Sequence, residues 1–335
     1  MRILVVGPSW IGDMALAQPL LKLLHARHDE PVIDVVAPRW TLPLVERMPE
    51  VRRAIDLPVG HGELRLAAHW KLARQLRREH YDQAIVLPNS FKSALVPFFA
   101  GIRVRTGYIG EARYGLLTDA RRLPVKRLPQ IAQRYGELAL PRGEALRPPL
   151  PALGLRVEDA AKREVLARLG VEKQRPAVAL CPGAEYGPAK RWPARYFAEL
   201  AQGIAARGCS VWLIGSPNDV ALGSEIARAA GGACRNLCGE TTLGEAIDLL
   251  AATALIVTND SGLMHVAAAL GKPLIALYGS SSPEFTPPLS PNAQIMRLDL
   301  PCSPCFKRVC PLGHFNCMNQ LVPDRVLEEI DFDRM

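Results

Sequence analysis

The chain has 335 residues, of which 49% are hydrophobic and 22% charged, a balance typical of a globular protein large enough for two domains. No apolar run reaches the roughly 18 to 20 residues that a membrane-spanning helix needs, and the first residues already read as a strand. These features exclude a helical integral membrane protein and predict a cytoplasmic one.

The net charge of +8 is concentrated in the first part of the chain. Residues 1–150 contain 23 Lys and Arg against 14 Asp and Glu, whereas residues 151–335 contain 18 against 19. A basic first part predicts a large anionic partner, either a phosphorylated acceptor or an anionic membrane surface. Nucleic acid is not expected, because only 6% of the residues are aromatic and no nucleic-acid-binding motif is present.

Apolar strands and helices alternate through the first part of the chain. Strands are predicted at residues 3–6, 32–36, 53–57 and 84–87, and helices at 14–24 and 66–78. Such alternation is typical of a parallel sheet covered on both faces by helices. We therefore expect a doubly wound, Rossmann-like α/β domain over residues 1–150.

A stretch rich in proline and charge, residues 141–151, predicts a linker, and the alternation then resumes. Helices are expected at 157–169, 193–207 and 243–251, and strands at 177–180, 210–214 and 255–257. This pattern predicts a second Rossmann-like domain over residues 151–323. A C-terminal segment, 324–335, is expected to form a helix that crosses back to the first domain.

The stretch 255–279, LIVTNDSGLMHVAAALGKPLIALYG, reads as strand, turn, helix and strand. Asp260 or Ser261 is the expected N-cap of a helix that begins near Gly262. A buried strand that leads into a helix presents free backbone N–H groups, which favours an anionic ligand such as a phosphate. His265, one turn further, would project towards the same place. Its spacing fits a packed helix histidine as well as a diphosphate donor.

This stretch resembles the nucleotide-sugar motif of the bacterial lipopolysaccharide heptosyltransferases. Four other segments match the family in the same order, and the resemblance covers nearly the whole chain: VVGPSWIGDM at 5–14, LPNSFKS at 87–93, CPGAEYGPAKRWP at 181–193 and FTPPLS at 285–290. The resemblance implies the GT-B architecture, in which two Rossmann-like domains face each other across a cleft.

The resemblance also implies an inverting, metal-independent transfer of heptose from ADP-heptose to the first heptose of the lipopolysaccharide inner core. The expected partners are ADP-heptose and an acceptor of the heptosyl-Kdo2-lipid A type, and no cofactor is required. Such an enzyme would be peripheral to the cytoplasmic face of the inner membrane. Transfer to another core acceptor such as Kdo, and a GT-B nucleotide-sugar epimerase, are the alternatives, although an epimerase leaves the basic first part unexplained.

The family pattern assigns the role of general base to Asp13, in the loop and helix start after the first strand. Glycosyl transfer needs a base for the acceptor hydroxyl, and a helix N-terminus favours a carboxylate in its charged form. The alternative, from sequence alone, is that Asp13 caps its helix. Ser9 and Gly12 of the same segment are assigned to donor binding.

Lys190 and Arg191 lie in a glycine- and proline-rich loop, together with Gly183, after the strand that ends at Cys181. A cation beside a leaving diphosphate offsets the charge that develops there, a role that a divalent metal takes in other glycosyltransferases. We therefore assign these three residues to donor binding and expect no metal ligands. The alternative for Lys190 is an exposed loop lysine.

Asn89, Ser90 and Lys92 follow the fourth strand and open an apolar helix. Amide, hydroxyl and ammonium groups at a helix start suit a phosphorylated sugar. Arg113 extends this basic region. We assign these four residues to acceptor binding.

Four cysteines and one histidine fall within residues 302–317, and their spacing would satisfy a tetrahedral zinc ion. The family pattern does not require a metal at this place. Free thiols are therefore the expectation, with structural zinc as the less favoured alternative for Cys302, Cys305, Cys310 and Cys317.

Overall fold

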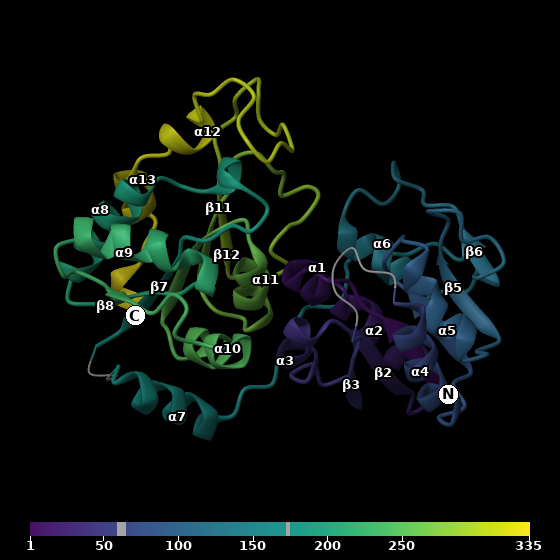
Figure 1. Cartoon of the computed structure of the whole chain (residues 1–335). Coiled ribbons are helices and arrows are strands. Elements are labelled where there is room, and N and C mark those ends of the chain that lie inside the picture. Colours follow the sequence, from purple (N-terminus) through teal and green to yellow (C-terminus); the bar gives the residue numbers. More distant parts are fainter. Residues whose placement is uncertain (59–64, 172–174) are drawn as a thin grey trace. The chain divides into compact units, whose positions relative to one another are not determined.

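A computed structural model describes residues 1–58, 65–171 and 175–335 (Figure 1). The chain divides into two compact units, Met1–Arg156 and Val157–Met335, and each has a six-stranded parallel sheet flanked by helices. The predicted α/β class with two doubly wound sheets is confirmed. Within the described residues, the helices are too short or too polar to cross a bilayer.

The first sheet has the strand order β3-β2-β1-β4-β5-β6. Its central strands are buried on both faces, which explains why they read as continuous apolar runs and not as alternating patterns. Val5 of β1 pairs with Val35 of β2 on one side and with Ile85 of β4 on the other. The strands are β1 (Arg2–Val6), β2 (Val32–Ala37), β3 (Arg53–Asp56), β4 (Gln83–Val86), β5 (Val104–Tyr108) and β6 (Asp119–Arg121).

The first predicted helix begins earlier than expected and is divided in two. Residue Ala17 separates its halves, and Pro19 lies in the first turn of the second, where the missing N–H breaks the helical hydrogen-bond pattern. The helices of this unit are α1 (Ile11–Leu16), α2 (Gln18–Arg27), η1 (Arg39–Thr41), α3 (Leu42–Val45), α4 (Leu66–Arg77), η2 (Lys92–Ala94), α5 (Leu95–Phe99) and α6 (Ile131–Glu137).

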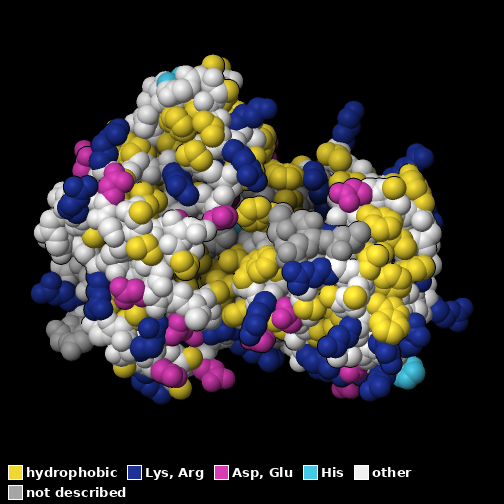
Figure 2. All heavy atoms as spheres, in the orientation of Figure 1, with side chains coloured by type: hydrophobic (Ala, Val, Ile, Leu, Met, Phe, Trp, Pro, Cys, Tyr) yellow, Lys and Arg dark blue, Asp and Glu magenta, His cyan; other side chains and the backbone are white. Residues whose placement is uncertain are grey.

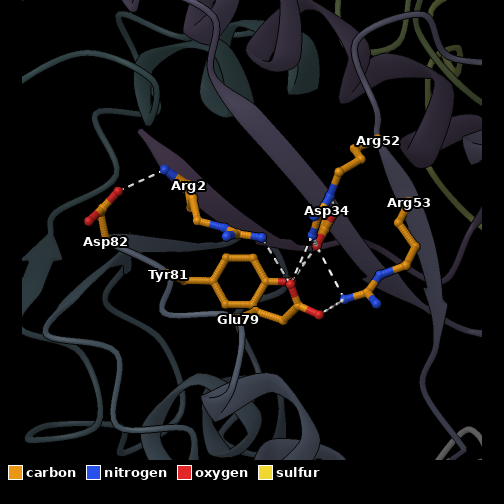
Figure 3. A network of polar contacts seen from close by, with 7 residues as sticks. All are labelled: Arg2, Asp34, Arg52, Arg53, Glu79, Tyr81 and Asp82. Carbon is orange, nitrogen blue, oxygen red and sulfur yellow. Dashed lines mark hydrogen bonds and ion pairs between the residues drawn. The ribbon is translucent and has the colours of Figure 1, made fainter.

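A network of polar contacts closes the amino edge of the first sheet (Figure 3). The carboxylate of Asp34, fully buried on β2, accepts hydrogen bonds from Nε of Arg52 at 2.8 Å and from the hydroxyl of Tyr81. Arg53 and Glu79 extend the network with an ion pair of 3.1 Å. Burial raises the pKa of Asp34, but the hydrogen bonds and the charges of the two arginines outweigh it and leave the pKa below its usual value. The charge is therefore kept at neutral pH.

The second sheet has the strand order β12-β11-β10-β7-β8-β9. Its strands are β7 (Ala177–Cys181), β8 (Ser210–Leu213), β9 (Arg235–Asn236), β10 (Leu255–Asn259), β11 (Leu274–Leu277) and β12 (Ala293–Met296). The helices of this unit are α7 (Asp159–Leu169), η3 (Pro188–Lys190), α8 (Ala194–Ala205), η4 (Pro217–Asp219), α9 (Val220–Ala229), α10 (Leu243–Ala251), α11 (Gly262–Ala269), α12 (Asn316–Asn319), α13 (Pro323–Glu328) and η5 (Phe332–Arg334).

The first unit extends beyond residue 150, where the sequence placed its end. Gly154 N donates to Oε1 of Gln18 at 2.9 Å, and Arg156 N donates to the carbonyl of Arg47 at 2.8 Å. These bonds attach residues 151–156 to the first unit. The change of unit therefore comes at Arg156, after the proline-rich stretch.

The last helix, α13, packs on α8 of the second unit. Val326 is fully buried in the core of this unit, and Leu327 lies against Gly203 of α8, where an added Cβ would meet a Leu327 methyl carbon at 2.8 Å. These contacts tie α13 to the second sheet and its helices. The expected return of the C-terminal segment to the first domain stays a prediction.

Candidate active site

Most of the predicted site residues lie in loops that leave the carboxyl ends of central strands. In the first unit these loops follow β1 and β4, and in the second they follow β7 and β10. This is the edge at which parallel α/β sheets hold their ligands. Each unit is therefore described from this edge.

Asp13 lies in the first turn of α1, and the N-cap of this helix is Trp10. The alternative that Asp13 is the capping residue is therefore wrong. Its carboxylate is half-buried within the helix start, where free N–H groups and the helix dipole favour a negative charge. This position leaves the role of general base open to Asp13.

Tyr135 of α6 is a neighbour of Asp13 that the sequence did not reveal. Burial, and then the negative charge of Asp13, raise the pKa of Tyr135 above its usual value. The phenol is therefore neutral at physiological pH. Tyr135 is thus a neutral polar group close enough to Asp13 to feel its charge, and it comes from α6, far away in the sequence.

The loop after β1 is fixed by two hydrogen bonds. Gly7 N donates to the carbonyl of Val36 at 2.9 Å, and Nε1 of Trp40 donates to the carbonyl of Ser9 at 2.8 Å. A Cβ on Gly7 would lie 2.4 Å from the terminal methyl group of Met14 on α1, so a larger residue would require the Met14 side chain to move. The predicted donor residues Ser9 and Gly12 are thus held at defined positions next to Asp13.

In the first unit, Arg113 lies in the interior and not on a basic surface as expected. Only 2% of the residue is exposed, and its guanidinium donates to the carbonyls of Tyr108 and Pro88, the latter at 2.6 Å. It also donates to Oδ1 of Asn89 at 3.1 Å and reaches the carbonyl of Ser90 at 3.5 Å. Burial lowers the pKa of Arg113 to about 10, which still leaves it charged at neutral pH.

Arg113 therefore contacts two of the other three predicted acceptor residues, Asn89 and Ser90, and holds the loop after β4. Ser93 completes this arrangement, because its Oγ donates to the carbonyl of Ser90 at 2.6 Å. The next amide, Phe91 N, donates to Glu111 at 2.9 Å. This geometry favours a positioning role for Arg113. The half-buried Lys92 opens the short helix η2 that follows.

In the second unit, Lys190 and Asp260 form an ion pair. Nζ of Lys190 lies 2.6 Å from Oδ2 of Asp260, and the same oxygen accepts a hydrogen bond from Oγ of Ser281. Both side chains are largely buried, with 16% and 4% exposed. The alternative that Lys190 is an exposed loop lysine is therefore wrong. Ser281 is a further residue of this group that the sequence did not reveal.

The helix α11 begins as the sequence predicted, directly after β10. Ser261 is its N-cap residue, so of the two alternatives Asp260 is not the cap and points instead to Lys190. Gly262 is the first helical residue. The backbone N–H groups of this first turn have no earlier helical carbonyl to bind, an arrangement that favours an anion at the end of β10.

His265 lies on α11, and only 3% of it is exposed. Its Nδ1 atom is buried and finds no hydrogen-bond partner among the described residues. Burial, the largest effect, and the charge of Lys190 lower the pKa of His265 to about 4, against a smaller opposite effect of Asp260. The imidazole is therefore neutral at physiological pH. A buried polar atom without a hydrogen-bond partner is uncommon in folded proteins, and a ligand bound at the start of α11 would be one way to satisfy it.

Asn259, at the end of β10, connects the two loops of this edge. Its Nδ2 donates to the carbonyl of Pro182 at 2.7 Å, and its Oδ1 accepts from Trp192 N at 3.1 Å. Trp192 is itself anchored, because its Nε1 donates to the carbonyl of Leu321 at 2.7 Å. These buried bonds hold the Lys190 loop against the start of α11. The sequence did not reveal that Asn259 connects these two loops.

Gly183 follows β7 and approaches another carboxylate. A Cβ on Gly183 would lie 2.5 Å from Oδ2 of Asp219, which accepts hydrogen bonds from N and Oγ of Ser216 at 2.9 and 2.7 Å. Only glycine fits there. Arg191, the residue after Lys190, has a buried Nε without a hydrogen-bond partner in the described part of the chain.

The segment 302–317 packs on the Lys190 loop. The Tyr186 hydroxyl donates to the carbonyl of Phe306 at 2.8 Å, and Ala189 N donates to the carbonyl of Arg308 at 3.0 Å. Two cations lie over the ring of Tyr186. The Nζ of Lys190 is 5.1 Å from the ring centroid, and the guanidinium carbon of Arg308 is 5.4 Å from it. Arg308 is thus a third cation of this region that the sequence did not reveal.

The four cysteines of this segment form no disulfide bond, and whether they hold zinc stays open. Backbone N–H groups of the turn that follows, from Phe315 above all, lower the pKa of Cys310, whereas burial raises the pKa of Cys317. Within residues 1–58, 65–171 and 175–335, no three His, Cys, Asp or Glu side chains are arranged to hold a metal ion.

Comparison of the sequence with known proteins identifies the family of this chain. Residues 69–316 match the model of glycosyltransferase family 9 (heptosyltransferase). The chain is 49% identical to lipopolysaccharide heptosyltransferase 2 of Escherichia coli K12, over 99% of this chain and 98% of that protein. It is 48% identical to lipopolysaccharide heptosyltransferase 2 of Salmonella typhimurium LT2, over 98% and 97%.

The fold agrees with a solved structure of this group. The structure of the E. coli ADP-heptose lipopolysaccharide heptosyltransferase II matches with a TM-score of 0.88 and 47% identity, over 98% of this chain and 97% of that one. This match confirms the predicted GT-B class. Taken with the family match and the identities above, it shows that the chain is a glycosyltransferase and belongs to glycosyltransferase family 9, the heptosyltransferases.

Proposed function

We propose that this enzyme transfers heptose from ADP-heptose to the first heptose of the lipopolysaccharide inner core, with inversion and without a metal ion. The observation that carries the proposal is the buried Lys190–Asp260 pair beside the unsatisfied His265, at the start of α11. It occurs in a chain that is about half identical to proteins named lipopolysaccharide heptosyltransferase 2.

The second unit binds the donor. The diphosphate lies at the first turn of α11, where the N–H groups after Ser261 and Gly262 point to its oxygens. Lys190 and Arg191 supply positive charge, and Asp260 orients Lys190 while offsetting part of its charge. The neutral His265 donates through its unsatisfied nitrogen. These contacts oppose the charge that grows on the leaving ADP.

The first unit binds the acceptor. Asn89, Ser90 and Lys92 offer an amide, a hydroxyl and an ammonium group to a phosphorylated sugar, and Arg113 fixes the backbone that carries them. The basic excess of residues 1–150 attracts the same anionic acceptor over longer distances. Because such an acceptor carries a lipid, the enzyme would work as a peripheral protein at the cytoplasmic face of the inner membrane.

The chemistry is a single displacement. Asp13 takes the proton of the acceptor hydroxyl while the hydroxyl oxygen attacks the anomeric carbon of the donor. The bond from this carbon to the diphosphate oxygen breaks on the opposite face, and ADP leaves with the bonding electron pair. Inversion follows from one displacement at one carbon. The cations at Lys190 and Arg191 take the role that a divalent metal has in other transferases.

The decisive experiment is a panel of donors and acceptors with the purified protein, followed by release of the free nucleoside diphosphate. We expect ADP release with ADP-heptose and heptosyl-Kdo2-lipid A, and little with Kdo2-lipid A, which lacks the first heptose. The same activity in a metal chelator, and NMR of the new glycosidic bond, would support metal independence and inversion. Release without an acceptor, or preference for Kdo2-lipid A, would contradict the assignment.

A further inference from the structure

The first unit exposes an apolar and basic surface on α4 and α5 that the proposed transfer does not use. Its apolar members are large side chains with high exposure: Leu66 (51%), Trp70 (52%), Phe98 (41%) and Val104 (44%). Its cations are exposed or half-buried: Lys71, Arg74 and Arg77 lie on α4, and Arg103 and Arg105 lie at the start of β5, together with Val104. We call these nine residues the α4–α5 face.

The exposed apolar side chains of α4 lie on one side of the helix. Leu66, Trp70 and Arg77 are four and seven residues apart, so they lie on one side of the helix. At the C-terminal end of this side, Nη2 of Arg77 donates to the carbonyl of Phe99 at 2.7 Å and so contacts the end of α5. Below it, Leu72 and Leu76 pack with Val96 in one core cluster, which fixes the two helices together.

Cations lie directly against the exposed aromatic rings of this face. The guanidinium of Arg74 is 4.8 Å from the ring centroid of Trp70, and that of Arg105 is 5.5 Å from the ring centroid of Phe98. Figure 2 shows hydrophobic and basic side chains next to one another over the part of the first unit that carries these helices. An aromatic ring beside a cation suits the boundary between acyl chains and headgroups.

The charge of α4 identifies the partner. Residues 65–78 contain five Lys and Arg and no Asp or Glu. A second copy of this face would bring like charges together, which disfavours self-association. A flat anionic surface with an apolar layer beneath it satisfies both the cations and the exposed rings.

We propose that the α4–α5 face docks the enzyme on a bilayer that carries anionic lipids. Trp70 and Phe98 insert at the headgroup level while the surrounding cations contact lipid phosphates. This inference deepens the proposed function, because it assigns a surface of the first unit to the membrane that holds the acceptor. It does not depend on which sugar is transferred.

The test compares two double variants with the same change in charge. Trp70→Glu/Lys71→Glu alters the α4–α5 face, and Val125→Glu/Lys126→Glu alters another exposed pair of a hydrophobic residue and a lysine in the same unit. Co-sedimentation uses vesicles of phosphatidylglycerol and phosphatidylcholine in equal parts, and vesicles of phosphatidylcholine alone. Circular dichroism and ADP binding confirm that each variant is folded.

We expect the wild type and the Val125 variant to sediment with the anionic vesicles. The affinity of the Trp70 variant for them should fall by at least about tenfold. With acceptor in vesicles, the Trp70 variant should lose turnover, while acceptor in detergent restores it. Vesicle binding without acceptor separates this inference from the proposed transfer. Wild type that ignores anionic vesicles, or equal loss in both variants, overturns the inference. A dimer that only the Trp70 variant loses also overturns it, in favour of a second copy.

Discussion

Nζ of Lys190 lies 2.6 Å from Oδ2 of Asp260, and the two residues are 70 positions apart in the chain. The pair joins the loop after β7 to the end of β10, at the start of α11. A lysine held in this way is positioned before the donor binds, so little side-chain entropy remains to be lost on binding.

Lys190→Ala should weaken ADP binding by about ten- to a hundredfold, because it removes a buried cation from the proposed diphosphate site. Asp260→Asn should weaken it less, since the lysine remains but is no longer paired. Calorimetric titration with ADP measures both. Arg195→Ala, an exposed arginine at the start of α8, is the control and should bind ADP as the wild type does. Unchanged affinity in the Lys190 variant would remove this residue from the donor site.

Asp13→Asn should lower kcat by about a hundredfold or more while ADP binding stays near normal, because the amide cannot take the proton of the acceptor hydroxyl. Single-turnover kinetics with saturating acceptor measures the rate of the transfer step directly, alongside kcat. Asp56→Asn, at the end of β3, is the matched control. Turnover close to that of the wild type would show that Asp13 serves only the structure of α1.

Tyr135→Phe tests whether the neighbour of Asp13 matters for its titration. The phenol is a neutral donor near a carboxylate, so its removal should shift the acidic limb of the pH–rate profile of kcat/KM towards higher pH. A merely structural tyrosine would lower stability and leave the limb in place. The measurement is kcat/KM across the acidic range for both proteins.

Lys92 and Arg113 should differ in how their loss acts, although the sequence grouped them. Lys92→Ala should raise the acceptor KM and leave the free energy of unfolding nearly unchanged. Arg113→Ala should also destabilise the first unit, by roughly 2 to 4 kcal/mol, because it leaves buried carbonyls without donors. Urea unfolding and acceptor kinetics on both variants make the comparison. Equal stability of the two variants would contradict the buried role of Arg113.

The sequence predicted the central strands well, because buried parallel strands are continuous apolar runs. It missed β5, β6, β9 and β12, which lie at or near the sheet edges and are short or carry polar residues. Val104–Tyr108, for example, contains an arginine and a glycine, which no periodicity distinguishes from a loop. Pairing with the neighbouring strand, and not local propensity, forms these elements.

The sequence motifs predicted which residues belong to the candidate site, but not which of these residues contact one another. Lys190 and Asp260 were both expected to bind donor, but their ion pair depends on the order of β7 and β10 in the sheet. Arg113 is read from sequence as a surface cation, because arginines are rarely buried, and only the loop that surrounds it shows five acceptor groups within reach. Long-range packing decides both cases.

The buried His265 makes the stability of the second unit depend on pH. The unfolded chain takes up a proton at this histidine near pH 6.5, whereas the folded protein does so only near pH 4. Between these values the unfolded state binds more protons, so the contribution of His265 is complete above pH 6.5 and is lost as the pH falls towards 4. The loss amounts to roughly 2 to 3 kcal/mol at pH 4.5.

Urea unfolding of the wild type and of His265→Asn at pH 7 and pH 4.5 isolates this contribution, because other groups titrate in both proteins. We expect the variant to lose roughly 2 to 3 kcal/mol less than the wild type between the two pH values. NMR titration of the imidazole should show His265 uncharged down to about pH 4. If both proteins lost equal stability, the folded and unfolded states would share one pKa, and His265 would be open to solvent.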